Sequence, residues 1–187
     1  LALASLAALG VLTTLAFLAA GADATGSVIY GAAVMALGAV FVGVTAVLAQ
    51  AFGHQRSVWG AALGIVVVSY LVRGIGAVDG RWVVWLSPHG WYDETAPFGE
   101  PRVTPFVLAG VVTAGLIALA LALSAGRDVG GSLVAARTGP PRASAGLLTP
   151  LGLALREHRT VTLGWAVITG VLMGTYGSLT QTVIDAF

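Results

Sequence analysis

The residues of this chain that could do chemistry are few, and their spacing fits none of the common catalytic or metal-binding arrangements. There is no cysteine, which excludes disulfides and thiolate metal sites. All nine basic residues are arginines, whereas a phosphate-binding loop needs a lysine. The histidines His54, His89 and His158 lie in three different connections, and none has a second ligand three or four residues away. We therefore expect no metal, no cofactor and no catalytic residue in this chain.

One charge, Arg73, lies well inside an apolar run, VVVSYLVRGIGAV. A long arginine side chain can extend along apolar surface to the membrane interface, where it would pair with an acid such as Asp79. Alternatively, a charge within a membrane segment faces a polar cavity between helices. The two interpretations are compatible, and Arg73 is a candidate residue of a transport path.

A second unusual stretch, WLSPHGWYDETAPFGEP, runs from Trp85 to Pro101 between two apolar segments. Its tryptophans and tyrosine prefer the membrane interface, its three acids require water, and its three prolines exclude one continuous helix. Irregular backbone at membrane depth is tolerated only where protein or a watery cavity covers it. The stretch must therefore fold against the rest of the protein or remain at the surface.

We predict a re-entrant hairpin over about residues 81–101 at the outer face. A short helix from Arg81 to about Leu86 would dip inward, and a turn at Pro88–Gly90 would reverse the chain. Gly90 would supply a backbone conformation that larger residues rarely adopt, and a second short segment would return to the acids. The alternative is an aromatic loop that rests flat on the outer interface.

The elements that must position these residues are membrane helices. Hydrophobic residues make up 57% of the 187 residues and charged residues only 9%, against about 25% charged in soluble domains. Five apolar segments reach the roughly 20 residues that cross a bilayer as a helix, so we predict an all-α integral membrane protein with five transmembrane helices. The predicted spans are Leu1–Ala20, Val28–Ala51, Ser57–Val78, Val103–Ala125 and Val161–Ile184.

Charge predicts the orientation of these helices. The connection Gly126–Thr160 holds five arginines, and an excess of arginine marks the cytoplasmic side. Because the helices alternate in direction, the acidic connection 79–102 is then extracytoplasmic and the connection 52–56 is cytoplasmic. The lone Arg56 falls on the cytoplasmic side, as the rule requires.

The arginine-rich connection contains a second element. Gly139-Pro140-Pro141 breaks any regular structure. After it, Thr149 and Pro150 are typical of a helix N-cap and a first-turn proline, and the segment Leu147–Arg159 is apolar before its basic end. We predict an elbow helix in the inner membrane interface. The alternative is that this segment extends the next membrane helix inward.

The last predicted span has a polar outer half that includes Tyr176 and Gln181. These side chains would either hydrogen-bond to neighbouring helices or line a path. The small residues at Gly170 and Gly174 favour close helix packing.

Four motifs, SYLVRGIG, WLSPHGW, APFGE and TPLGLALREHRTVTLGWAV, together resemble the permeases of actinobacterial ABC-2 type exporters, most closely the polyketide-antibiotic and multidrug subgroup. The resemblance extends from Arg56 to about Gly177. Its most specific element is Ser-Pro-x-Gly-Trp at Ser87–Trp91, in which His89 replaces an expected leucine.

The resemblance implies two six-helix halves in the bacterial cytoplasmic membrane. Residues 1–125 would hold the last four helices of the first half, 126–146 a cytoplasmic linker, and 147–187 the elbow helix and first span of the second half. Such a permease exports hydrophobic or amphipathic compounds, such as drugs or antibiotics, by alternating access. Two copies of a separate ATPase subunit, which bind ATP and Mg, would drive it, and no nucleic acid is involved.

The resemblance also assigns candidate site residues. The substrate path or outer gate would include Arg73, Trp85, Ser87, Pro88, Gly90, Trp91, Tyr176 and Gln181. The inner surface that faces the ATPase would include His54, Arg56, Arg156, Glu157 and Arg159. The alternative function is a membrane scaffold or receptor subunit without transport, and the missing catalytic groupings disfavour an intramembrane enzyme.

Overall fold

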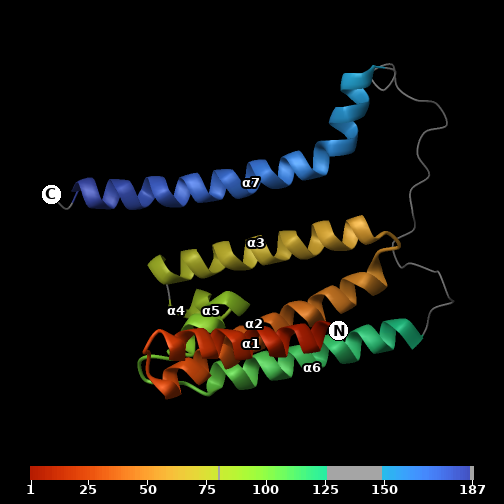
Figure 1. The fold of residues 1–187 in the computed structure, drawn as a ribbon. Helices are drawn as coiled ribbons and strands as arrows, with labels where there is room; N and C mark the ends of the chain where they lie inside the picture. Colours follow the sequence, from red (N-terminus) through yellow and green to blue (C-terminus); the bar gives the residue numbers. More distant parts are fainter. Residues whose placement is uncertain (80, 126–148, 186–187) are drawn as a thin grey trace. The chain divides into compact units, whose positions relative to one another are not determined.

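The computed structural model describes residues 1–79, 81–125 and 149–185, and its elements are helices (Figure 1). Four of them are long and apolar enough to cross a membrane. The all-α class is therefore confirmed, and the chain is a multi-pass membrane protein. The helices are α1 (Ala2–Ala19), α2 (Ala24–Ala51), α3 (Gln55–Asp79), α4 (Arg81–Val84), α5 (Pro88–Glu94), α6 (Thr104–Ala125) and α7 (Pro150–Asp185).

The four candidate spans, α1, α2, α3 and α6, match the first four predicted segments within a few residues. The largest difference is at the start of α2. Its N-cap is Asp23, whose carboxylate accepts a hydrogen bond of 2.7 Å from the Gly26 amide. This capping bond lets the helix begin one turn before Val28, the first strongly apolar residue.

The helices of the first compact unit, Leu1–Ala136, pack closely through glycines. The central helix α2 contacts α1, α3, α5 and α6. A Cβ atom at Gly31 would lie 2.1 Å from Thr14 Oγ1, and one at Gly43 would lie 3.0 Å from Leu116 Cβ. Small residues therefore bring α1 and α6 against α2, as expected for helices in lipid.

The second unit, Arg137–Phe187, contains α7. Its predicted cap is confirmed, because the Gly152 amide donates to Thr149 Oγ1 at 3.1 Å. At 36 residues the helix is about 54 Å long, more than the roughly 30 Å of hydrocarbon. The predicted elbow segment is the continuous start of α7, and Figure 1 shows these first turns at an angle to the rest. A fifth span and an interfacial position of the elbow stay predictions.

Candidate outer gate

The stretch between α3 and α6 folds as two short helices joined by a tight reversal. Helix α4 ends in turns in which the amides of Leu86 and Ser87 donate to the oxygens of Val83 and Val84, at 3.0 and 3.2 Å. Ser87 is then the N-cap of α5, with Pro88 in its first turn. The predicted turn at Pro88–Gly90 is therefore wrong, because a proline whose fixed φ suits the first helical turn begins a helix here.

Gly90 is required for space rather than for an unusual backbone conformation. Gly21 is the glycine with positive φ among the described residues, and in this stretch the left-handed residue is Ala96, with φ 45°. A Cβ atom at Gly90 would lie 2.1 Å from the backbone oxygen of Val84. One at Gly76 would lie 2.6 Å from the Val84 amide nitrogen. Val84 is thus held between two glycines, one in α3 and one in α5.

Helix α5 is covered by protein on several sides, since it contacts α2, α3, α4 and α6. Trp91 is buried and packs with Val40 of α2 and Ala109 of α6. Its indole Nε1 donates to the backbone oxygen of Trp85 at 2.7 Å. Both tryptophans predicted for the gate therefore face into the bundle, and their hydrogen bond closes the hairpin.

Two groups of polar contacts connect α3 to α5. We call their residues, Ser69, Arg73, Ser87, His89 and Asp93, the polar seam. In the first, Ser69 Oγ lies 2.9 Å from Ser87 Oγ and 2.9 Å from His89 Nδ1. In the second, Arg73 Nε donates to Asp93 Oδ2 in an ion pair. The pairs 69–89 and 73–93 repeat one helical turn apart, so α3 and α5 run parallel with a constant offset.

The ion pair answers one question that the sequence left open. Arg73 pairs with an acid, and that acid is Asp93 of the hairpin; the side chain of Asp79, named as an example of a partner, lies outside the described residues. The Arg73 guanidinium also lies over the ring of Tyr70, with its carbon 5.5 Å from the ring centre. Arg73 therefore fastens the hairpin to α3.

The outer end of the hairpin is tied to α1 and α2 by aromatic rings. Phe98 lies against Phe17 and Tyr30, with ring centroids 5.4 and 6.0 Å apart, and Tyr30 meets Tyr92 edge-on at 5.6 Å. Arg102 donates to Glu94 at 2.5 Å. The return segment from α5 to α6 is thus anchored at both ends.

Burial shifts the ionisation of two groups in α5, a helix outside the four candidate spans. Loss of water around His89, with a smaller effect of the Arg73 charge, lowers the pKa of that imidazole below its usual 6.5. Burial and a hydrogen bond to Tyr30 raise the pKa of Tyr92. His89 is therefore held neutral and Tyr92 stays protonated at neutral pH.

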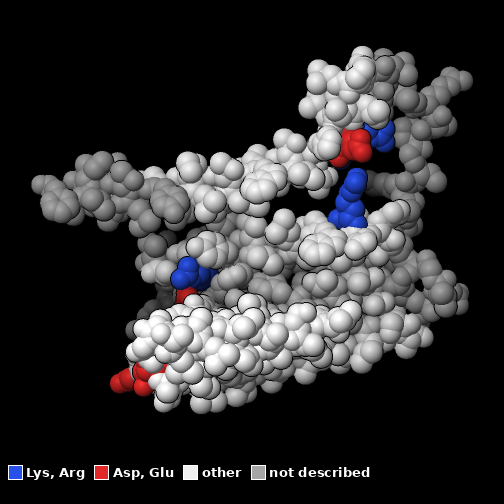
Figure 2. Space-filling view, in the orientation of Figure 1, with Lys and Arg blue, Asp and Glu red and all other residues white. Residues whose placement is uncertain are grey.

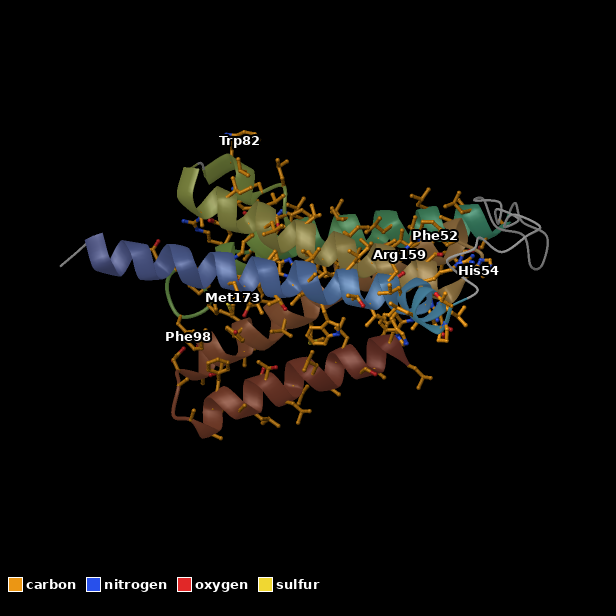
Figure 3. All side chains as sticks on the ribbon, turned by 90° about the horizontal axis from the view of Figure 1, so that it is seen from above. Phe52, His54, Trp82, Phe98, Arg159 and Met173 are labelled. Atoms are coloured by element: carbon orange, nitrogen blue, oxygen red, sulfur yellow. The ribbon has the colours of Figure 1, made fainter. Side chains whose placement is uncertain are left out.

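The predicted inner residues are exposed, and two of them, His54 and Arg56, lie at the end of α3 that is far from the hairpin. His54 directly precedes α3 and Arg56 lies in its first turn, while the hairpin follows its end. Figure 3 shows Trp82 and His54 at opposite ends of α3. Arg156, Glu157 and Arg159 are exposed on the first turns of α7. The side chains of Tyr176 and Gln181 lie outside the described residues. Charged side chains occupy only small areas of the surface in Figure 2.

The seam residues Ser69, His89 and Asp93 were not among the predicted site residues. Each contact joins positions 18 or 20 residues apart, and no local periodicity marks such a pairing. The usable signal was that SxxxR in α3 and HxxxD in the hairpin share helical spacing.

Comparison with known proteins supports the same class of protein. No family model matches the sequence. The chain is similar to a multidrug efflux system permease protein of Mycobacterium tuberculosis, with 36% identity over 170 residues. The match covers 89% of this chain and 31% of that relative, so the chain spans about a third of the relative's length. The predicted resemblance to an ABC-2 type exporter permease is thereby confirmed, and the chain is a membrane-spanning protein related to a multidrug efflux permease.

Proposed function

We propose that this chain is part of the permease of an ATP-driven exporter of hydrophobic or amphipathic compounds, in the bacterial cytoplasmic membrane. In this proposal the hairpin Arg81–Thr95 re-enters the membrane from the outer face and closes the outer end of the transport path. The similarity to a multidrug efflux system permease protein supports export. The hairpin geometry supports the gate.

The observation that carries the proposal is how far the hairpin reaches along α3. Its tip residues Ser87 and His89 contact Ser69. Ser69 lies ten residues before the end of α3 at Asp79, which is about 15 Å along a helix. The hydrocarbon core is about 30 Å thick, so the tip would lie well below the outer interface. This reach supports a re-entrant hairpin over a loop that rests flat on the outer interface.

Backbone at membrane depth must be hydrogen-bonded and covered by protein, and the hairpin meets both requirements. Its reversal is short, its amides bond to nearby backbone oxygens, and Ser87 is fully buried. Neighbouring helices cover α5. A covered, hydrogen-bonded hairpin can remain within hydrocarbon, and its release from α3 would uncover a path to the outside.

Energy for export would come from a separate ATPase subunit. The chain has no lysine for a phosphate-binding loop. The exposed residues His54 and Arg56 at the start of α3 are candidates for the surface that docks this subunit, together with the basic start of α7. Transmission along α3 would then connect the docking end to the gate.

Cysteine labelling of the full-length permease in intact cells tests the gate. Ser87→Cys, fully buried at the hairpin tip against Ser69 of α3, should react slowly with a bulky impermeant maleimide at rest and faster during ATP-driven turnover. Glu100→Cys, exposed beyond the hairpin, is the control and should react at the same rate in both states. Equal labelling of the two positions in both states would show that the stretch is a surface loop and would overturn the proposed gate.

A further inference from the structure

The hydrogen bonds of the polar seam fix where neutral His89 carries its hydrogen. The Ser87 hydroxyl donates to the backbone oxygen of Ser69 at 2.6 Å. With that hydrogen used, the Ser69 hydroxyl must donate to Ser87 Oγ, so His89 Nδ1 must donate to Ser69 Oγ. Nδ1 therefore holds the hydrogen of the neutral ring, and Nε2 is the atom that would accept a second proton.

The surroundings of His89 contain one cation and one anion among the described residues. Phe41 of α2 and Tyr70 of α3 place their rings 5.4 and 5.7 Å from the imidazole centre. The charges that act on the imidazole are Arg73 of α3 and Asp93 of its own helix. A proton on Nε2 would thus enter a half-buried site between two rings, close to a fixed positive charge.

We propose that His89 is a proton sensor of the outer gate, and that its protonation releases α5 from α3. A protonated ring repels Arg73 across the seam. It also makes Asp93, one turn further along α5, an anion for which two cations compete. Both effects weaken the Arg73–Asp93 pair that holds the hairpin. Nδ1 carries its hydrogen in both forms of the ring, so the ion pair, and not the bond to Ser69, is the contact that protonation weakens.

The direction of the pH dependence follows from the environment of the ring. Burial lowers the pKa of His89 below 6.5, so the seam is fully formed above about pH 6.5. Its stability is lost as the pH falls through the lowered pKa, because the released state binds the proton more tightly. Acid on the outer side would therefore favour the open hairpin.

The inference rests on the proposed gate, but its test needs no transport. Val84→Cys reports release, since Val84 is buried between α3 and α5. Its labelling rate by an impermeant maleimide is divided by that of exposed Glu100→Cys at the same pH, which cancels the intrinsic pH dependence of the thiol. The permease is full-length, in membranes and without nucleotide. We expect this ratio to rise several-fold between pH 7.5 and pH 5.

Two variants distinguish proton sensing by His89 from a general loosening of the hairpin at low pH. His89→Asn places an amide donor where Nδ1 lies but cannot take a proton, so its ratio should stay low at both pH values. Asp93→Asn removes the anion that pairs with Arg73, so the labelling ratio in this variant should be high at both pH values. A ratio that is flat with native His89, or that rises equally in His89→Asn, would overturn the sensor. Labelling of Ser87→Cys during turnover, at constant pH, would still test the proposed gate independently of the sensor.

Discussion

At the scale of single residues, Arg73 is important for position more than for stability. The side chains of Arg73 and Asp93 are 35% and 38% exposed, so neither belongs to the packed interior of the bundle. The pair nevertheless sets the register in which α5 lies on α3. Its loss should therefore change the behaviour of the gate while leaving the bundle folded.

Arg73→Ala should lower export of a fluorescent amphipathic compound more than it lowers the amount of permease in the membrane. Arg73→Lys should recover only part of the activity, because an ammonium lacks the planar guanidinium that pairs with Asp93 and lies over Tyr70. Export normalised to membrane level, measured by immunoblot, is the readout. A fall in level that matches the fall in export would assign Arg73 a structural role only.

The sequence indicated Arg73, Trp85 and Trp91 as unusual but could not give their partners. A charge in an apolar run is visible from composition alone. Its pairing with Asp93 depends on where the chain reverses, and the prediction placed that reversal three residues late, at Pro88. An error in the position of the reversal makes the predicted contacts wrong as well, because it changes which residues face each other across the hairpin.

At the scale of helices, prediction from apolar runs worked because lipid requires long helices with internal hydrogen bonds. The four spans were found for this reason. The polar ends of the helices were harder to predict from apolar runs, as the start of α2 after its cap Asp23 shows. The short helices α4 and α5 fall below the length at which periodicity is informative.

Val84 is held between Gly76 and Gly90, and this predicts a sharp contrast among glycine variants. Gly90→Ala and Gly76→Ala should each destabilise the hairpin, since their Cβ atoms would meet backbone atoms of Val84 at 2.1 and 2.6 Å. Overpacking of this kind typically costs about 1–3 kcal/mol. The melting temperature of the detergent-solubilised permease should fall in both variants.

Gly74→Ala is the matched control, because among the described residues no atom beyond its chain neighbours and its own helix backbone lies within 4 Å of the added Cβ. Alanine is favoured over glycine inside a helix by up to about 1 kcal/mol, so this variant should be as stable as the native permease or more stable. Equal destabilisation at positions 74 and 76 would show that the close approach to Val84 is not what matters.

At the scale of the whole molecule, orientation in the membrane is a separate prediction. With the arginine-rich connection inside, Ser144→Cys should resist an impermeant thiol reagent in intact cells and react after permeabilisation. Glu100→Cys should react without permeabilisation. Thr95 is unsuitable for this purpose, since its side chain is buried. The reverse labelling pattern would invert the topology.

The second prediction at this scale is that a separate subunit, and not the permease, binds and hydrolyses ATP. The full-length permease purified alone should neither bind nor hydrolyse ATP, because the proposal assigns nucleotide hydrolysis to a separate subunit. Addition of the nucleotide-binding subunit should restore hydrolysis, and charge reversal at Arg56 should weaken that association. Binding of a fluorescent ATP analogue by the permease alone would contradict the proposal.

The short sequence separation across the polar seam has a consequence for biogenesis. Its contacts close loops of 18 or 20 residues, whereas α2 and α6 join positions as distant as Gly43 and Leu116. Local contacts form before distant ones, and synthesis proceeds from the N-terminus. The hairpin can therefore fold onto α3 before α6 has left the ribosome. The nascent chain would then carry the hairpin on α3 before α6 is inserted, and α6 would complete the cover of α5 by packing Ala109 against Trp91.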